Sequence, residues 1–152
     1  MVHVSFLESP IGWLRILSNG KGITEIKFVE FEGPDDPDPH TESAKTQLRE
    51  YFAGKRSSFT LKLLPEGTKF EHLVWQELQK IPEGTTTNYG TIAAKIGDPK
   101  ASQAVGKANG KNPIAVVVPC HRVIGADHKL TGYAAGTHRK EWLLKHEGAL
   151  LL

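Results

Sequence analysis

The single cysteine of this 152-residue chain, Cys120, is the residue best suited to act as a nucleophile. It is followed directly by His121 and Arg122, at the end of a short apolar run. A thiol with an unperturbed pKa of about 8.5 is mostly protonated at neutral pH, and neighbouring basic or cationic groups raise its thiolate fraction. The neighbours of Cys120 therefore indicate an activated thiol.

A second interpretation of Cys120 stays open on these residues alone. A free cysteine is most often a small buried hydrophobe. Residues 114–118 read IAVVV, which predicts a short buried strand that Pro119 closes. Because neighbouring side chains on a strand point to opposite faces, His121 can assist Cys120 only if the chain turns there.

The composition of the chain excludes several kinds of site. One cysteine allows no internal disulfide and no cysteine pair for structural zinc, and the seven histidines show no spacing typical of a metal site. We therefore expect neither a metal nor a cofactor.

No apolar run reaches the roughly 20 residues that span a bilayer, and the N-terminus lacks a basic region followed by an apolar core. We expect no membrane contact, and a cytoplasmic, nucleoid-associated location in a bacterium or a nuclear one in a eukaryote.

Positive charge gathers in the second part of the chain. The net charge is +2, but residues 1–65 carry 8 Lys or Arg against 9 Asp or Glu, whereas residues 66–152 carry 11 against 8. Within residues 95–122 the five basic residues accompany a single acid, Asp98. Such a stretch suits a polyanion such as nucleic acid, although basic stretches are more often ordinary solvated surface.

Residues 1–65 predict a small α/β domain. Short apolar runs, separated by turn-forming residues at 9–12 and 18–22, predict three strands. The sequence GPDDPDP at 33–39 predicts a loop, and apolar residues at helical spacing predict a helix after it. Phe59, Leu61 and Leu63 then alternate as in a further strand. We place the boundary of this domain at residues 64–68.

Residues 66–152 predict a mainly helical domain. Apolar residues at helical spacing predict a first helix that buries one stripe, formed by Phe70, Leu73, Val74, Leu78 and Ile81. A last helix is expected to run from Thr137, as its N-cap, through His146, and Gly148 is expected to terminate it.

Two short helices are expected between these. The first runs from about Asn88 to Ile96, and the second from Asp98, as its N-cap, to Asn109. Two short helices joined by a tight turn resemble a helix-turn-helix, although a generic helical hairpin gives the same pattern. The second helix is almost free of bulky side chains, which suits either close helix packing or entry into a narrow groove.

One motif and its flanks are specific enough to indicate a family. The run PCHRV at residues 119–123, with NP ahead of it and GY and HEG behind it, closely resembles the O6-alkylguanine-DNA alkyltransferases, or methylated-DNA–protein-cysteine methyltransferases. The likeness covers residues 70–148, and the N-terminal part is similar in layout only. The resemblance implies an α/β, ribonuclease-H-like domain at 1–65 and a mainly α, winged helix-turn-helix-like domain at 66–152.

The resemblance also implies catalytic roles. Cys120 would accept the alkyl group, His121 would take the thiol proton through a water, and Glu147 would orient His121. Tyr89 would give a proton or a hydrogen bond to a ring nitrogen of the guanine. The implied reaction is a single, irreversible transfer from O6 of guanine, with O4 of thymine left open, because no residue here is suited to reopening a thioether.

Other positions would contact double-stranded DNA or the extruded base. A base inside a duplex hides its O6 substituent, so the resemblance implies flipping of the base through the minor groove into a pocket. Residues 101–109 would form the recognition helix, Asn112 would brace the active-site turn, and Arg122 would hold the two domains together by ion pairing. The implied substrate and DNA contacts are Ala101, Ser102, Gln103, Ala104, Lys107, Asn109, Asn112, Val118, Arg122, Val123, Tyr133 and Ala134. A monomer would suffice for this reaction.

The sequence departs from the family's pattern at three positions. Gln103 stands where an arginine usually fills the gap left by the flipped base, so extrusion is expected to be weaker. Ala134 stands where a small residue with a hydroxyl often follows the pocket tyrosine, which leaves one contact to O6 to the backbone. Ala135 replaces one of a usual pair of glycines, and its methyl group is expected to disfavour bulky adducts.

Three other functions compete with alkyl transfer. Alkyltransferase-like proteins bind the same lesions but have tryptophan in place of the nucleophile, which Cys120 argues against. A winged helix-turn-helix regulator that uses Cys120 as a sensor would need a second regulatory domain. A cysteine hydrolase would turn over, and the sequence offers no clear oxyanion-hole loop. The mass of the protein after mixing with alkylated DNA distinguishes these functions.

Overall fold

The computed structural model describes residues 1–125 and 133–149, and the chain divides into two compact units. The N-terminal unit consists of residues 1–66 together with residues 113–117, and the C-terminal unit of residues 67–112 and the chain from 118 onward. The division after residue 66 lies within the expected boundary at 64–68. No pattern in the sequence, however, indicates that residues 113–117 belong to the first unit.

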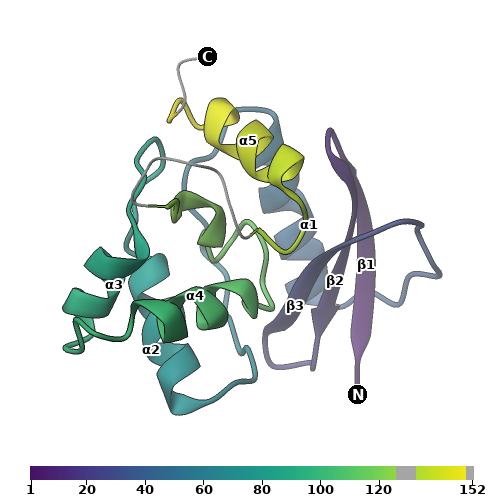
Figure 1. The fold of residues 1–152 in the computed structure, drawn as a ribbon. Helices are drawn as coiled ribbons and strands as arrows, with labels where there is room; N and C mark the ends of the chain where they lie inside the picture. Colours follow the sequence, from purple (N-terminus) through teal and green to yellow (C-terminus); the bar gives the residue numbers. More distant parts are fainter. Residues whose placement is uncertain (126–132, 150–152) are drawn as a thin grey trace. The chain divides into compact units, whose positions relative to one another are not determined.

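The N-terminal unit contains a three-stranded antiparallel sheet in the order β1-β2-β3 (Figure 1). Its strands are β1 (His3–Ser9), β2 (Gly12–Ser18) and β3 (Ile23–Val29). Leu14 of the central strand pairs with Leu7 on one side and with Phe28 on the other. Because side chains alternate across a strand, the fully buried Leu14 and Ile16 lie on the same face of β2, and this face forms the core.

Helix α1 (Pro39–Phe52) packs against β1 and β2 within this unit. The helix begins with a capping box, in which the Asp38 carboxylate accepts from the Thr41 amide at 2.8 Å and Thr41 Oγ1 accepts from the Asp38 amide at 3.0 Å. Leu48 and Tyr51 are fully buried at helical spacing. The first three predicted strands and the helix after the loop are therefore confirmed. The strand predicted at 59–63 is wrong, because among these residues Leu63 alone makes an isolated bridge, to Ile23.

The C-terminal unit is mainly helical, as the sequence predicts (Figure 1). Its elements are α2 (Lys69–Leu78), α3 (Tyr89–Lys95), α4 (Ser102–Gly110), the 3-10 turn η1 (Cys120–Arg122) and α5 (Thr137–His146). Helices α2, α3 and α4 pack on one another. Asn88 caps α3 by accepting from the Thr91 amide at 2.8 Å, so the predicted start of this helix is confirmed.

Residues 114–118 do not form the strand that their apolar run predicts. Ile114 makes one isolated bridge to Ile26, and the chain then turns. Val116 has a φ of +70°, which is the sole positive φ among the described non-glycine residues. The Val117 amide donates to the Ala115 carbonyl at 2.8 Å, which closes a γ-turn around Val116.

Two predicted helix starts are also wrong. The N-cap of α4 is Ala101, not Asp98, because the Ala101 amide donates to the Asp98 carbonyl at 3.0 Å in a turn that precedes the helix. Thr137 is the first residue of α5, and Gly136 occupies the N-cap with a φ of +100°. A side chain at that φ is strained, so the glycine sets the start of the helix.

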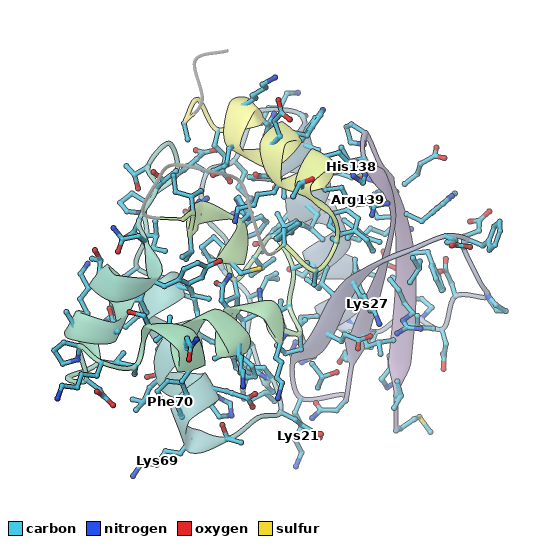
Figure 2. All side chains as sticks on the ribbon, viewed as in Figure 1. Lys21, Lys27, Lys69, Phe70, His138 and Arg139 are labelled. Carbon is cyan, nitrogen blue, oxygen red and sulfur yellow. The ribbon has the colours of Figure 1, made fainter. Side chains whose placement is uncertain are left out.

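The buried face of α2 differs from the predicted stripe. Leu73 is 43% exposed, whereas Trp75 is 2% exposed. The Trp75 indole donates to the Ala108 carbonyl at 2.9 Å and so anchors α2 to α4. Figure 2 shows Lys69 projecting from the first turn of α2.

Candidate active site

The nucleophile lies on a turn rather than on a strand. Cys120 begins η1 and is 6% exposed. Its amide donates to the Val118 carbonyl at 2.8 Å, and the Arg122 amide donates to the Pro119 carbonyl at 3.0 Å. Because the chain turns here, the opposite-face restriction of a strand does not separate His121 from Cys120.

Two asparagines from the end of α4 and the residues after it hold the nucleophile segment. Asn112 Nδ2 donates to the Val118 carbonyl at 2.8 Å, and its side chain also hydrogen-bonds the Cys120 sulfur. Asn109 Nδ2 donates to the Cys120 carbonyl at 3.4 Å. The family resemblance implies a bracing role for Asn112 and a DNA contact for Asn109.

His121, Arg122 and Glu147 form a buried cluster. His121 Nε2 lies 2.8 Å from Glu147 Oε2, Arg122 Nε donates to Glu147 Oε1 at 2.8 Å, and Arg122 Nη2 donates to Oε2 at 3.0 Å. Arg122 Nη1 donates to the Ile81 carbonyl at 2.6 Å. These partners all belong to the C-terminal unit, so the Arg122 ion pair is internal to that unit and is not the expected link between domains. Arg122 is also 6% exposed, and its expected contact with DNA stays a prediction.

The cluster sets the protonation of its members. Burial opposes ionisation of Glu147, but hydrogen bonds from His121 and Arg122 outweigh it and lower the pKa of Glu147 to about 2. Burial lowers the pKa of His121, against the opposite effect of Glu147. At neutral pH the carboxylate can only accept, so the His121 proton lies on Nε2 and Nδ1 keeps its lone pair. This buried Nδ1 has no hydrogen-bond partner in the described part of the chain.

Cys120 itself needs a base. Burial raises the pKa of the Cys120 thiol, although Asn112 and the positive charge of Lys140 act in the opposite direction. Lys140 is fully buried, and its Nζ donates to the Val123 carbonyl at 2.6 Å. A thiol that is protonated at neutral pH must lose its proton during the reaction, and the lone pair on His121 Nδ1 is suited to take it.

Two tyrosines lie on the same unit. Tyr89 is the first residue of α3, and burial followed by the Cys120 charge raises the pKa of its hydroxyl, which therefore remains a donor. A Cβ placed on Gly106 of α4 would lie 3.9 Å from two ring atoms of Tyr89, so α4 passes close to this ring. Tyr133 is 8% exposed, and burial raises the pKa of its hydroxyl well above the ordinary value. The Tyr133 hydroxyl has no hydrogen-bond partner among the described residues.

Helix α4 has one exposed and one buried face. Gln103, Ala104 and Lys107 are exposed, whereas Ala101 and Ser102 are partly exposed at its start. Asn109 lies four residues after the fully buried Val105 and is itself 2% exposed. The helical period turns this side chain away from the exposed face of α4, and its expected contact with DNA stays a prediction.

The groups expected to read the base edge differ in their hydrogen bonding and in their exposure to solvent. The carbonyls of Val118 and Val123 already accept from Asn112 and Lys140. Ala134 is exposed, and Tyr133 is buried beside it. Gly132, the glycine of the GY pair, lies outside the described residues.

The family comparison agrees with this geometry. The ribonuclease-like domain of 6-O-methylguanine DNA methyltransferase matches residues 2–65, and the DNA binding domain of 6-O-methylguanine DNA methyltransferase matches residues 69–149. The chain belongs to the 6-O-methylguanine DNA methyltransferase family. Its architecture, with a small N-terminal sheet domain and a helical C-terminal domain, is that of the family.

Relatives match over nearly the whole chain. The methylated-DNA–protein-cysteine methyltransferase of Methanosarcina acetivorans is 48% identical over 97% of this chain and 99% of its own. The crystal structure of Mycobacterium tuberculosis O6-methylguanine methyltransferase matches with a TM-score of 0.89 at 46% identity, over 98% of this chain and 94% of that one. A crystal structure of the M. tuberculosis protein in complex with DNA matches with a TM-score of 0.88 at 46% identity, over 97% and 93% of the two chains.

Lys140 is the site residue that sequence reasoning missed. It lies three and four residues before the fully buried Leu143 and Leu144, on the same face of α5. This spacing relative to two leucines predicts that Lys140 faces the core.

Among the described residues no helix is long and apolar enough to cross a membrane, and no three acidic, histidine or cysteine side chains gather as metal ligands would.

Proposed function

We propose that this chain repairs alkylated DNA by moving the alkyl group from O6 of guanine onto Cys120, once per molecule. The observation that carries the proposal is the buried Cys120 beside a neutral His121 whose Nε2–H is held by the ionised Glu147. Such an arrangement activates a nucleophile. Family membership supplies the substrate class.

The proposed step is a displacement at the alkyl carbon. The Sγ–C bond forms as the C–O6 bond breaks, and the thiol proton passes through a water to His121 Nδ1. The guanine that leaves takes a proton from the Tyr89 hydroxyl. The thioether has no leaving group of comparable quality, so the protein is consumed.

The partner is proposed to be double-stranded DNA, entered from the minor groove. The exposed Gln103, Ala104 and Lys107 on α4 would lie against the groove, and α3 with α4 would act as a helix-turn-helix in a winged domain. Small side chains on this helix suit a narrow groove. Gln103 would fill the space of the flipped base, with less benefit than an arginine because it lacks charge and reach.

Three further properties belong to the same proposal. The N-terminal unit would be a ribonuclease-H-like domain with a supporting role. The protein would act as a monomer, since the cluster around Cys120 is complete within one C-terminal unit. It would work where the DNA is, in the nucleoid or the nucleus.

The test is the intact mass of the protein after mixing with duplex DNA that contains O6-methylguanine. We expect the mass to rise by one methylene group, the modified peptide to contain Cys120, and product to stop at one equivalent in excess substrate. Cys120→Ser is expected to bind the DNA without gaining mass, because its hydroxyl is a far weaker nucleophile. Repeated turnover would indicate a hydrolase, and binding with no transfer by the unchanged protein would indicate a sensor or a lesion-binding protein.

A further inference from the structure

The Arg122 side chain has a partner outside the proton relay. Its Nε and Nη2 donate to the two carboxylate oxygens of Glu147, at 2.8 and 3.0 Å. Its Nη1 donates to the Ile81 carbonyl at 2.6 Å, across 41 residues of sequence. The relay explains the bonds to Glu147, because this carboxylate also holds His121. The bond to Ile81 has no role in that relay.

Ile81 begins the segment that leads to Tyr89. Residues 81–88, which we call the Tyr89 loop, lie between α2 and the first residue of α3. At the other end of this loop, the Thr87 amide donates to the Arg122 carbonyl at 2.9 Å. The side chain of Arg122 therefore holds the start of the Tyr89 loop, and its backbone holds the end.

The middle of the Tyr89 loop packs on Glu147. A Cβ placed on Gly84 would lie 3.2 Å from the Glu147 carbonyl oxygen, and Gly84 has a φ of +83°. A side chain is strained at this φ and would also press on the carbonyl, so glycine permits the close approach. The loop thus contacts the residues of the proton relay at its start, its middle and its end.

The position of this loop determines the position of Tyr89. Asn88, the last residue of the loop, caps α3, and Tyr89 is the next residue. The Cys120 charge acts on the Tyr89 hydroxyl, so the two side chains lie near each other. A proton donor must lie within hydrogen-bond reach of the atom that it protonates. A displacement of 1 Å at a reacting group can lower a rate by about 100-fold.

We propose that Arg122 is a positioning residue for both proton transfers of the reaction. It orients His121 through Glu147, and it places Tyr89 through the Tyr89 loop. This inference rests on the proposed function, in which Tyr89 protonates the guanine that leaves. A guanidinium suits the role because its rigid fork can hold a carboxylate and a carbonyl together, whereas a lysine keeps the charge but lacks the fork.

The experiment compares two methyl donors for the same sulfur atom. O6-methylguanine in duplex DNA releases a guanine that needs a proton, whereas methyl iodide releases iodide, which needs none. In both reactions the Sγ–C bond forms and His121 receives the thiol proton, so only the reaction with DNA uses Tyr89. The rate of methylation of Cys120 is measured with each donor by peptide mass, and the DNA reaction is followed over a single turnover at saturating protein.

Arg122→Lys is expected to slow the two donors unequally. Transfer from DNA should slow by about tenfold more than the reaction with methyl iodide, because Tyr89 is displaced as well. In a Tyr89→Phe background, the same substitution should slow both donors by equal factors, since no hydroxyl is left to displace. If Arg122 acted only through Glu147, or only by stabilising the unit, it would slow both donors equally in both backgrounds, which overturns the inference.

Arg56→Lys is the matched control. Arg56 also joins a carboxylate and a carbonyl, those of Glu50 and Ser58, each at 3.0 Å. It lies in the N-terminal unit, away from the residues of the relay. We expect this variant to methylate Cys120 at the unchanged rate with either donor. The matched substitution thus shows that loss of a guanidinium fork alters the ratio of rates only at Arg122.

Gly84→Ala displaces the Tyr89 loop without altering Arg122. The added methyl group is strained at this φ and meets the Glu147 carbonyl, so the loop must move. We expect transfer from DNA to slow by about fivefold or more, while the reaction with methyl iodide stays within about twofold. Normal transfer from DNA, or equal slowing of both donors, would overturn the inference. This variant decides the question if Arg122→Lys does not fold.

The inference and the proposed function fail in different ways. Absence of transfer from DNA to Cys120 in the unchanged protein overturns the proposed function and the inference with it. Transfer by the unchanged protein, with equal slowing of both donors in the variants, overturns the inference alone. Circular dichroism and affinity for unmodified duplex are measured for each variant, so that rates are compared only between folded, DNA-binding proteins.

Discussion

Four buried ionisable side chains determine the charge around Cys120. Arg122 and Glu147 neutralise each other through two hydrogen bonds, and His121 is neutral because burial lowers its pKa. Lys140 contributes a positive charge, and its Nζ donates to the Val123 carbonyl. The positive charge of Lys140 stabilises a developing thiolate, which offsets part of the effect of burial on the pKa of Cys120.

Residue types and spacing predict part of this site. The motif at 119–123 and the later Glu147 indicate the proton relay, and the structure places His121 and Glu147 in contact. Lys140 escapes such reasoning, and Asn109 is expected on the DNA surface rather than against Cys120, because a polar residue on a helix is expected to face solvent. Their burial depends on partners, the Val123 and Cys120 carbonyls, that are distant in sequence.

Glu147→Gln tests how the cluster couples stability to pH. The folded pKa of Glu147, about 2, lies below the ordinary 4.5. This carboxylate therefore contributes stability that is present above pH 4.5 and is lost as pH falls toward 2, by ~3 kcal/mol in total. We expect Glu147→Gln to be less stable at pH 7, since Arg122 loses its buried counter-charge. Its free energy of unfolding should fall less steeply between pH 5 and pH 2, as measured by urea unfolding.

The same variant tests the relay. Without the carboxylate, His121 is no longer held with its proton on Nε2, so alkyl transfer should slow while affinity for duplex DNA stays nearly unchanged. The Glu141→Gln variant provides a matched control, because Glu141 lies on α5, whose C-cap is Glu147, in a surface pair with Lys145. An unaltered transfer rate in folded Glu147→Gln would show that the relay is wrong.

Helix α4 connects the expected DNA surface to the nucleophile. Its exposed face carries Gln103 and Lys107, one turn apart, and its buried face carries Asn109, which bonds the Cys120 carbonyl. The sequence locates the helix and its small side chains correctly but misplaces its start. Asp98 and Pro99 are typical N-terminal residues, and here they form the preceding turn.

Lys107→Met tests whether α4 meets the DNA backbone. A lysine that neutralises a phosphate releases counterions, so affinity for duplex DNA should fall and its logarithmic salt dependence should become shallower by about one. The loss should be the same for all sequences. Lys80→Met is the control, because Lys80 is also highly exposed but lies beyond the end of α2. Equal salt slopes for the two variants would place the DNA surface elsewhere.

Residues 114–118 show how burial and backbone conformation can be predicted separately. The apolar run correctly indicates burial, since Ile114, Val116 and Val118 are each at most 1% exposed. It does not indicate a ladder partner, and a single bridge to Ile26 is all that forms. A β-branched residue at positive φ, as in Val116, is rarely tolerated, and no sequence pattern signals it.

At the scale of the molecule, the chain crosses between its two units more than once. It leaves the C-terminal unit after Asn112, contributes residues 113–117 to the N-terminal unit, and returns at Val118, two residues before the nucleophile. The Ile26 amide donates to the Pro113 carbonyl and the Ala115 amide donates to the Ile26 carbonyl, both at 2.9 Å. The edge strand β3 is therefore completed by a segment far away in sequence, which a boundary at 64–68 cannot reveal.

Ile114→Ala tests this interleaving through hydrogen exchange. Ile114 is fully buried, so its truncation should cost about 2–5 kcal/mol. Because residues 113–117 complete the N-terminal unit, amide protection should fall most in peptides from β2 and β3. Leu143→Ala removes an equally buried side chain from α5 and should reduce protection most in the C-terminal unit. Exchange is followed by mass spectrometry under native conditions. If Ile114→Ala loosened α2 to α4 and left β2 and β3 protected, then residues 113–117 would stabilise the C-terminal unit instead.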